Sequence, residues 1–180
     1  TVSANIAISL AMKGYKVILV DADLRNPSTA KVLGMQEQEL GTLQVLKGEV
    51  KIEDAVQPYK DTSVMVLAGS SPIQDTSTVL SGENMRQFIK ELEAKADFVV
   101  IDTPPSAMLS DAAIVAQYVD GAVFVIRQDY TEADRILEGM EILSSSGAQI
   151  TGCILNDANV KGNSSQHYKN SYRLKGEVKV

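Results

Sequence analysis

Two hydrophobic runs in this chain each end in aspartates. The run at residues 17–20 leads into Asp21 and Asp23, and the run at residues 98–101 leads into Asp102. Such aliphatic runs suit parallel strands covered on both faces, and ligands of parallel sheets lie beyond the carboxyl ends of the strands. We therefore expect the three carboxylates to converge on one crevice, where they would repel each other unless a cation lay between them. Hard oxygen ligands favour Mg²⁺ with a phosphate-bearing substrate, so the two motifs predict a nucleotide site.

These residues also have plainer explanations. An aspartate after a buried strand can simply cap the following helix, which would account for one motif more readily than for both. Arg25 follows the first motif. It either pairs with Asp23 or acts electrostatically near a phosphate or a subunit interface, because a cation beside carboxylates keeps them ionised at neutral pH.

The composition is that of an ordinary globular domain. The chain has 180 residues, of which 44% are hydrophobic and 22% charged, and its net charge is −6. Five basic residues and one acidic residue lie in residues 159–180, so the remainder is strongly acidic and no nucleic-acid partner is expected. We expect one domain over residues 1–158 and a flexible basic tail over residues 159–180. The single Cys153 excludes an internal disulfide, and its apolar neighbours predict a buried core position.

Hydrophobic periodicity predicts alternating helices and strands. Helices are expected over residues 1–12, 29–33, 42–46, 85–92, 110–118 and 131–147, and strands over residues 17–20, 64–67, 98–101, 121–126 and 149–155. Ser110 is expected to cap one helix, and Thr131 with Asp134 to form a capping box for another. This alternation predicts a parallel sheet with right-handed crossovers, and hence a three-layer α/β/α domain.

The acidic motifs carry a family resemblance. Val-Asp-Ala-Asp-Leu-Arg at residues 20–25 and Val-Ile-Asp-Thr-Pro-Pro at residues 100–105 closely resemble motifs of the bacterial tyrosine kinases of capsule and exopolysaccharide clusters. These kinases are a branch of the deviant P-loop ATPases, in which the first motif is a second Walker A-type motif and the second is Walker B. The resemblance extends from Thr1 to about Asn156, and it implies a P-loop NTPase fold.

The resemblance implies an ATP- and Mg²⁺-dependent protein-tyrosine autokinase. Asp23 and Asp102 would bind Mg²⁺, largely through its waters, and Asp21 would orient the attacking tyrosine hydroxyl or accept its proton. All three are thus candidate catalytic residues. Arg25 and Asn156 are the candidate cofactor-binding residues. Asn156 could read an adenine edge with its amide, or it could be a plain turn residue at the end of a strand.

The tail holds Tyr168 and Tyr172 among polar residues. The family typically ends in a tyrosine-rich cluster that the neighbouring subunit phosphorylates, and this tail is a sparse version of it. The resemblance therefore implies that these tyrosines are phosphoacceptors, although surface tyrosines in a loose tail are common.

The resemblance also implies partners. They are a membrane-anchored activator of the polysaccharide co-polymerase type, further copies of the chain in a homo-oligomer, and the polysaccharide synthesis machinery. No apolar run approaches the roughly 20 residues that span a bilayer, so we expect a cytoplasmic protein that a partner recruits to the inner face of the membrane.

The start of the chain bears on activity. Residues 1–7 resemble the helix that follows the phosphate-binding loop in this family, but the loop ending Gly-Lys-Ser or Gly-Lys-Thr and the strand before it are not in the sequence. We expect this chain alone to bind ATP weakly, to be inactive, and to expose a hydrophobic slot where a central strand is missing. Two alternatives stay open: a switch ATPase of the cell-division or plasmid-partitioning type, and a catalytically inert fragment.

Overall fold

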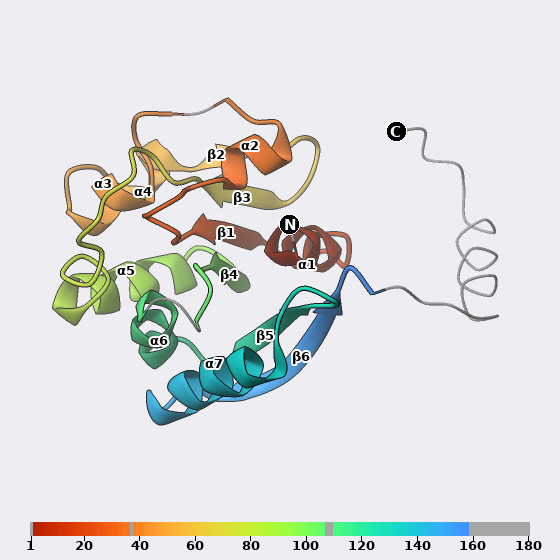
Figure 1. Cartoon of the computed structure of the whole chain (residues 1–180). Helices are drawn as coiled ribbons and strands as arrows, with labels where there is room; N and C mark the ends of the chain where they lie inside the picture. Colours follow the sequence, from red (N-terminus) through yellow and green to blue (C-terminus); the bar gives the residue numbers. More distant parts are fainter. Residues whose placement is uncertain (1, 37, 107–109, 159–180) are drawn as a thin grey trace, which may run out of the picture.

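Aliphatic strands alternate with helices, as the hydrophobic pattern predicts. The computed structural model describes residues 2–36, 38–106 and 110–158 (Figure 1). The helices are α1 Val2–Ala11, α2 Thr29–Leu33, α3 Thr42–Leu46, α4 Ile52–Ala55, α5 Gly82–Glu93, α6 Asp111–Val115 and α7 Ala133–Ser145, with a 3₁₀ turn at Ala116–Tyr118. The strands are β1 Val17–Asp21, β2 Gln57–Pro58, β3 Val64–Leu67, β4 Phe98–Asp102, β5 Ala122–Arg127 and β6 Ile150–Asn156.

The main sheet has the strand order β2-β3-β1-β4. Strand β1 pairs in parallel with β3 and β4, and all five of its residues are buried. The sequence did not predict the short α4 or the two-residue β2, which pairs antiparallel with β3. The mostly parallel α/β fold is confirmed.

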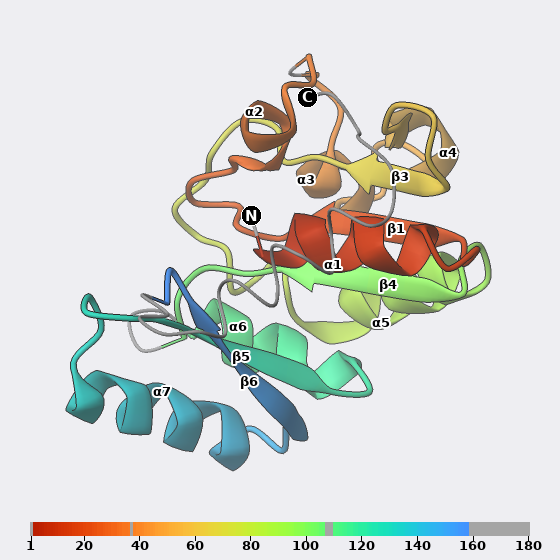
Figure 2. The ribbon, with the colours of Figure 1, turned by 90° about the vertical axis from the view of Figure 1, so that its right-hand side faces the viewer.

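Helices cover both faces of this sheet. On one face, Ala4 and Ala7 of α1 pack against Val17 and Leu19 of β1. On the other, the apolar stripe of α5 packs in one cluster with alternate residues of β1; its members are Met85, Phe88, Ile89 and Leu92. Small residues on α1 allow the helix to approach the sheet closely, which holds its amino end near the carboxyl ends of β1 and β4 (Figure 2).

Strands β5 and β6 form a separate two-stranded parallel sheet. Within the described residues β4 has a single hydrogen-bonded neighbour, although its apolar sequence is typical of a strand covered on both sides. Phe98 of β4 is 42% exposed, and Val123 and Val125 of β5 are 47% and 45% exposed. Hydrophobic side chains of β4 and β5 are therefore exposed, and β4 has one unpaired edge among the described residues, which favours association. The slot left by a missing central strand stays a prediction.

Three local predictions were wrong. Cys153 is exposed, because the β6 strand that carries it is paired only with β5 among the described residues. Ser110 makes no side-chain capping bond; its φ of −70° and ψ of −10° are helical rather than extended. Helix α7 begins after Glu132, which has the extended backbone of an N-cap. The predicted capping box placed the N-cap at Thr131, one residue too early.

Residues 159–180 lie outside the described residues. The predicted boundary at residue 158 and the phosphoacceptor assignment of Tyr168 and Tyr172 therefore stay predictions. Among the described residues, no helix has both the length and the apolar character needed to cross a bilayer.

Candidate functional site

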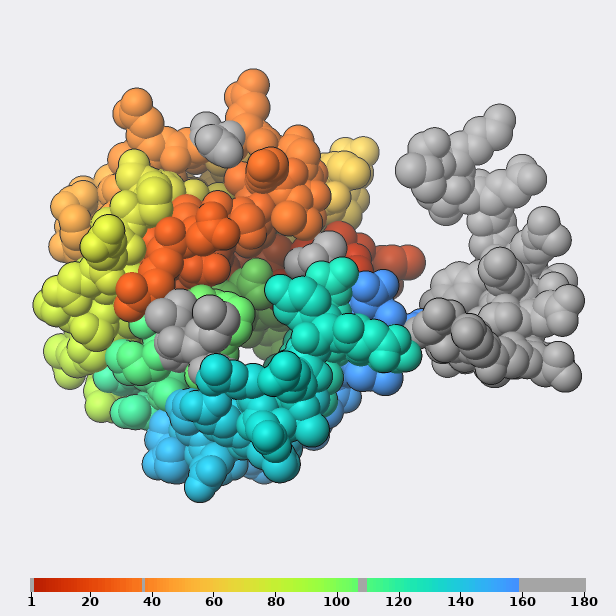
Figure 3. All heavy atoms as spheres, in the orientation of Figure 1, coloured from red at the N-terminus to blue at the C-terminus, as the bar shows by residue number. Residues whose placement is uncertain are grey.

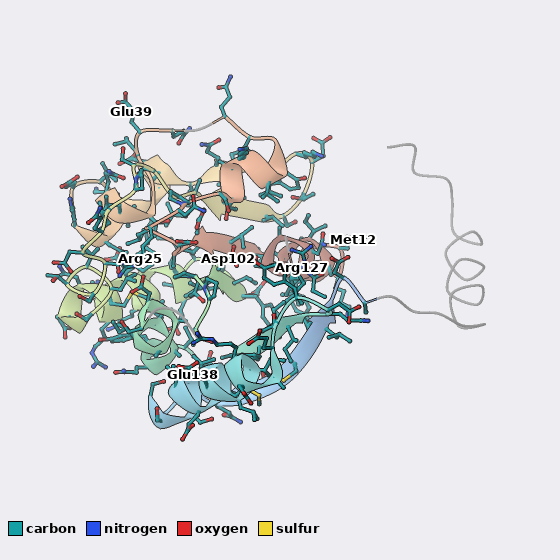
Figure 4. All side chains as sticks on the ribbon, viewed as in Figure 1. Met12, Arg25, Glu39, Asp102, Arg127 and Glu138 are labelled. Carbon is teal, nitrogen blue, oxygen red and sulfur yellow. The ribbon has the colours of Figure 1, made fainter. Side chains whose placement is uncertain are left out.

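Strands β1 and β4 bring the two acidic motifs together. Asp21 and Asp102 are register partners in the parallel pair, and the Ala22 N–H donates a hydrogen bond of 2.8 Å to the Asp102 backbone oxygen. The two acid-bearing loops thus leave the same edge of the sheet, where ligands of parallel sheets bind. In the view of Figure 4, Asp102 lies near the centre of the molecule between Arg25 and Arg127.

Asp21 holds the first loop in shape. It is only 1% exposed, and its carboxylate accepts three backbone N–H groups, from Asp23 at 3.2 Å and from Ser28 and Thr29 at 2.9 Å each. The last two bonds cap the amino end of α2. The plainer explanation from the sequence therefore describes what Asp21 does in the structure, and its role toward a tyrosine hydroxyl stays a prediction.

Replacing Asp21 with Ala should destabilise the fold. The change leaves buried N–H groups of the loop and of α2 without an acceptor, and we expect the free energy of unfolding to fall by about 2–3 kcal/mol. Urea denaturation measures this value. The exposed Asp61→Ala is the matched control and should change it by less than about 0.5 kcal/mol. Equal stabilities of the two variants would contradict the anchoring role.

Asp23 is half-buried and has one oxygen available. Its Oδ1 accepts the backbone N–H groups of Arg25 at 3.2 Å and Asn26 at 2.9 Å. Within the described part of the chain, Oδ2 makes no hydrogen bond. One carboxylate oxygen is thus fixed by the loop and the other is free to bind a cation.

Asp102 is partly buried at the end of β4. Burial raises the pKa of its carboxyl group, the Ser3 side chain lowers it through a hydrogen bond, and the neighbouring Asp21 and Asp23 raise it. Ser3 lies in the first turn of α1. Sequence analysis missed this residue, although a serine hydroxyl in the first turn of a helix can donate a hydrogen bond to a carboxylate.

The raised pKa of Asp102 predicts a pH dependence of stability. An acid with a higher pKa in the folded state contributes to stability below its unfolded pKa of about 4, and this contribution is lost as the pH rises through the folded pKa. Ionised Asp102 therefore costs stability at pH 7. We expect Asp102→Asn to raise the free energy of unfolding at pH 7 and to raise it less at pH 4.

Urea denaturation at both pH values checks this prediction. The exposed Asp120→Asn is the control and should show little change at either pH. An Asp102→Asn variant that is less stable than the original chain at pH 7 would contradict it.

The donor set fits a Mg²⁺ that arrives with phosphate. Within residues 2–36, 38–106 and 110–158, no three His, Cys, Asp or Glu side chains are grouped closely enough to hold a metal ion by themselves. The expectation that three carboxylates surround one cation is therefore not met. Asp23 and Asp102 remain two hard oxygen donors, and Mg²⁺ in nucleotide sites typically takes one or two carboxylates together with waters and phosphate oxygens.

Arg25 pairs with a residue that sequence analysis did not single out. Its Nε donates to Asp111 Oδ2 at 2.8 Å and its Nη2 to Asp111 Oδ1 at 3.2 Å. Nη2 also donates to Thr76 Oγ1 at 2.7 Å, and Nη1 to the Gln74 backbone oxygen at 2.7 Å. The pairing with Asp23 is not made. In the space-filling view, the orange-red residues that follow β1 lie on the same face of the molecule as α7 (Figure 3). The role of Arg25 as a cofactor ligand stays a prediction.

Asn156 lies on the second sheet. It is exposed at the end of β6, and its register partner on β5 is Arg127, which pairs with Asp157 at 3.1 Å. Asn156 and Ile154 also line a groove of about 440 Å³ with residues of α1, among them Asn5 and Ile6. Asn156 therefore lies beside an open groove. A contact between its side-chain amide and adenine stays a prediction.

Comparisons with known proteins agree with this arrangement. The ParA family model, described as NUBPL iron-transfer P-loop NTPase, matches residues 1–180. Tyrosine-protein kinase YwqD of Bacillus subtilis is 32% identical over 168 residues, which cover 93% of this chain and 70% of that protein. The kinase domain of the Escherichia coli tyrosine kinase ETK is 28% identical with a TM-score of 0.83, covering 90% of this chain and 63% of that chain.

A second similar structure contains a ligand. The septum site-determining protein MinD of Pyrococcus horikoshii, complexed with Mg-ADP, has a TM-score of 0.71 at 25% identity, covering 92% of this chain and 70% of that chain. The fold is that of a P-loop NTPase. The chain belongs to the ParA family of P-loop NTPases and, within it, to the bacterial tyrosine kinases.

Proposed function

We propose that this chain is the catalytic-domain portion of an ATP-dependent protein-tyrosine autokinase that regulates capsular or exopolysaccharide synthesis and export. The observation that carries the proposal is the pairing of β1 with β4, which sets the loops of Asp23 and Asp102 at one edge of the sheet. The names of the relatives support the reaction, since YwqD and ETK are both tyrosine kinases.

The residues of the site take different roles in this proposal. Asp23, through its free Oδ2, and Asp102 would hold Mg²⁺, and the ion would neutralise charge on the phosphates of ATP. Asp21 keeps the Asp23 loop in place through the amides of residues 23, 28 and 29. Its burial supports this positioning role more strongly than direct contact with the tyrosine hydroxyl.

The remaining parts of the proposal concern the tail and the partners. Tyr168 and Tyr172 would be the acceptors, phosphorylated by a neighbouring copy in a homo-oligomer. A membrane-anchored activator of the polysaccharide co-polymerase type would recruit the protein to the inner face of the membrane. The exposed apolar residues of β4 and β5 support association with another polypeptide segment, since unpaired apolar strand edges favour pairing.

A switch ATPase is the second candidate, and the similarity to MinD is the observation that favours it. Such a protein would signal by dimerisation and would bind a membrane or DNA in an ATP-dependent way. It would make no phosphotyrosine.

The test uses an extended chain, in which a hydrophobic strand and a Gly-rich loop ending Gly-Lys-Ser precede Thr1. Incubation with Mg-ATP should produce phosphotyrosine, detected by mass spectrometry. ATP-dependent binding to liposomes or DNA without phosphotyrosine would favour the switch ATPase. Isothermal titration of the 180-residue chain with Mg-ADP tests the need for the loop, and submicromolar binding would contradict it.

A further inference from the structure

Arg25 joins three separate segments of the chain. Its guanidinium binds both oxygens of Asp111 at the start of α6, and it also reaches Thr76 and Gln74 in the loop after β3. Asp111 and Thr76 are fully buried, and Thr76 Oγ1 donates a further hydrogen bond of 2.9 Å to Asp111 Oδ1. A buried carboxylate with this many partners is held in one place, so these contacts define a rigid point between the loops.

The backbone around Arg25 reinforces this junction. Leu24 is 2% exposed, and its carbonyl oxygen accepts the Ile73 N–H at 2.9 Å. The loop after β3 therefore binds the first acidic motif through the backbone of Leu24 and through the side chain of Arg25. Asp111 begins α6, the helix that follows the second acidic motif along the chain.

Asp23 depends directly on the position of Arg25. Its Oδ1 accepts the Arg25 backbone N–H at 3.2 Å and the adjacent Asn26 N–H at 2.9 Å. Any shift of Arg25 moves the two amides that orient the Asp23 carboxylate. The side-chain contacts of Arg25 therefore anchor a residue whose backbone N–H binds Asp23 Oδ1.

We propose that Arg25 is a positioning residue, and that its side-chain contacts to Asp111, Thr76 and Gln74, here called the Arg25 clamp, hold Asp23 in place relative to Asp102. The proposal rests on the proposed function only in taking these two aspartates as the Mg²⁺ ligands. Lys cannot replace Arg here, because the planar guanidinium contacts both oxygens of Asp111 as a fork and an ammonium is a point charge.

Hydrogen exchange in the 180-residue chain tests the clamp without any ligand. In Arg25→Gln and Arg25→Lys, the amides of Asn26 and Ile73 should exchange at least about tenfold faster, whereas the amide of Leu19 in β1 should change only as global stability changes. Arg135→Gln is the control, because it removes an exposed Arg–Glu pair on α7. Unchanged exchange of Asn26 and Ile73 would overturn the proposal.

The Mg²⁺ requirement of the extended chain separates positioning from a purely structural role. Arg25→Lys should raise the Mg²⁺ concentration for half-maximal phosphorylation by about tenfold or more, as loss of residues that orient metal ligands typically does. Leu92→Ala, a buried core change, should lower stability but leave this concentration unchanged. If Leu92→Ala raised this Mg²⁺ concentration as much as Arg25→Lys, the Arg25 contacts would only stabilise the fold, and the positioning role would be refuted. Absence of phosphotyrosine in the unsubstituted extended chain would refute the proposed function, while hydrogen exchange would still decide the clamp.

Discussion

Asp102→Asn in the extended chain is expected to slow tyrosine phosphorylation by about 100-fold or more, because it would remove a carboxylate ligand of the Mg²⁺ that neutralises phosphate charge. The substitution preserves the size of the side chain, and the backbone bond from Ala22 to the Asp102 carbonyl does not depend on the carboxylate. Steady-state rates at saturating ATP and Mg²⁺ measure the effect. The exposed Asp120→Asn should retain the full rate.

Measuring the stability of Asp102→Asn shows whether unfolding causes the loss of rate. Because burial raises the pKa of Asp102, Asp102→Asn should be more stable than the original chain at pH 7 while being nearly inactive. A loss of rate together with a gain in stability excludes unfolding as the cause. A variant that keeps its rate would show that Asp102 does not take part in the reaction.

Replacing Tyr168 and Tyr172 together with Phe is expected to remove most of the phosphotyrosine from the extended chain. Phe keeps the ring but lacks the hydroxyl that attacks the phosphate. Tyr130→Phe is the matched control, because Tyr130 is 75% exposed yet lies in the folded domain. Phosphotyrosine should be quantified site by site by mass spectrometry.

Mixing two chains, one that lacks an active site and one that lacks the acceptor tyrosines, tests transfer between copies. The Asp102→Asn chain has intact tail tyrosines, and the double Phe chain has an intact site. Together they should restore phosphotyrosine on the Asp102→Asn chain if a neighbouring copy phosphorylates the tail. If the double Phe chain, incubated alone, carried as much phosphotyrosine as the unsubstituted chain, the acceptor assignment of Tyr168 and Tyr172 would be refuted.

Much of the fold was predictable because its signals are local. The aliphatic runs before Asp21 and Asp102 predicted two buried strands, and β1 and β4 do form a parallel pair that places their final residues together. Burial is confirmed for β1 but not for β4, whose residues are only partly buried or exposed. The stripe at Met85 and Phe88 predicted α5 by its helical spacing. Strand β2 has two residues and no hydrophobic period, so it leaves no comparable signal.

The contacts within the site were less predictable. Arg25 and Asp111 are 86 residues apart, and nothing local to either residue indicates that they pair. Asp21 is buried because residues 26–29 fold back over the end of β1. This brings the backbone N–H groups of Ser28 and Thr29 to Asp21 Oδ2. Cys153 lies in an apolar run, but its burial depends on strands and helices packed beside β6, and these are tertiary features.

The most direct test of the account asks whether Asp23 and Asp102 hold the same ion. Mn²⁺ can replace Mg²⁺ in the extended chain with ADP, and its affinity can be measured by electron paramagnetic resonance for the unsubstituted chain, Asp23→Asn, Asp102→Asn and the double variant. We predict that each single change weakens Mn²⁺ binding by about tenfold or more and that the double change weakens it by clearly less than the product of the two, since ligands of one ion are coupled. Unchanged Mn²⁺ affinity in either single variant, or strictly multiplicative losses, would contradict a shared metal site at the ends of β1 and β4.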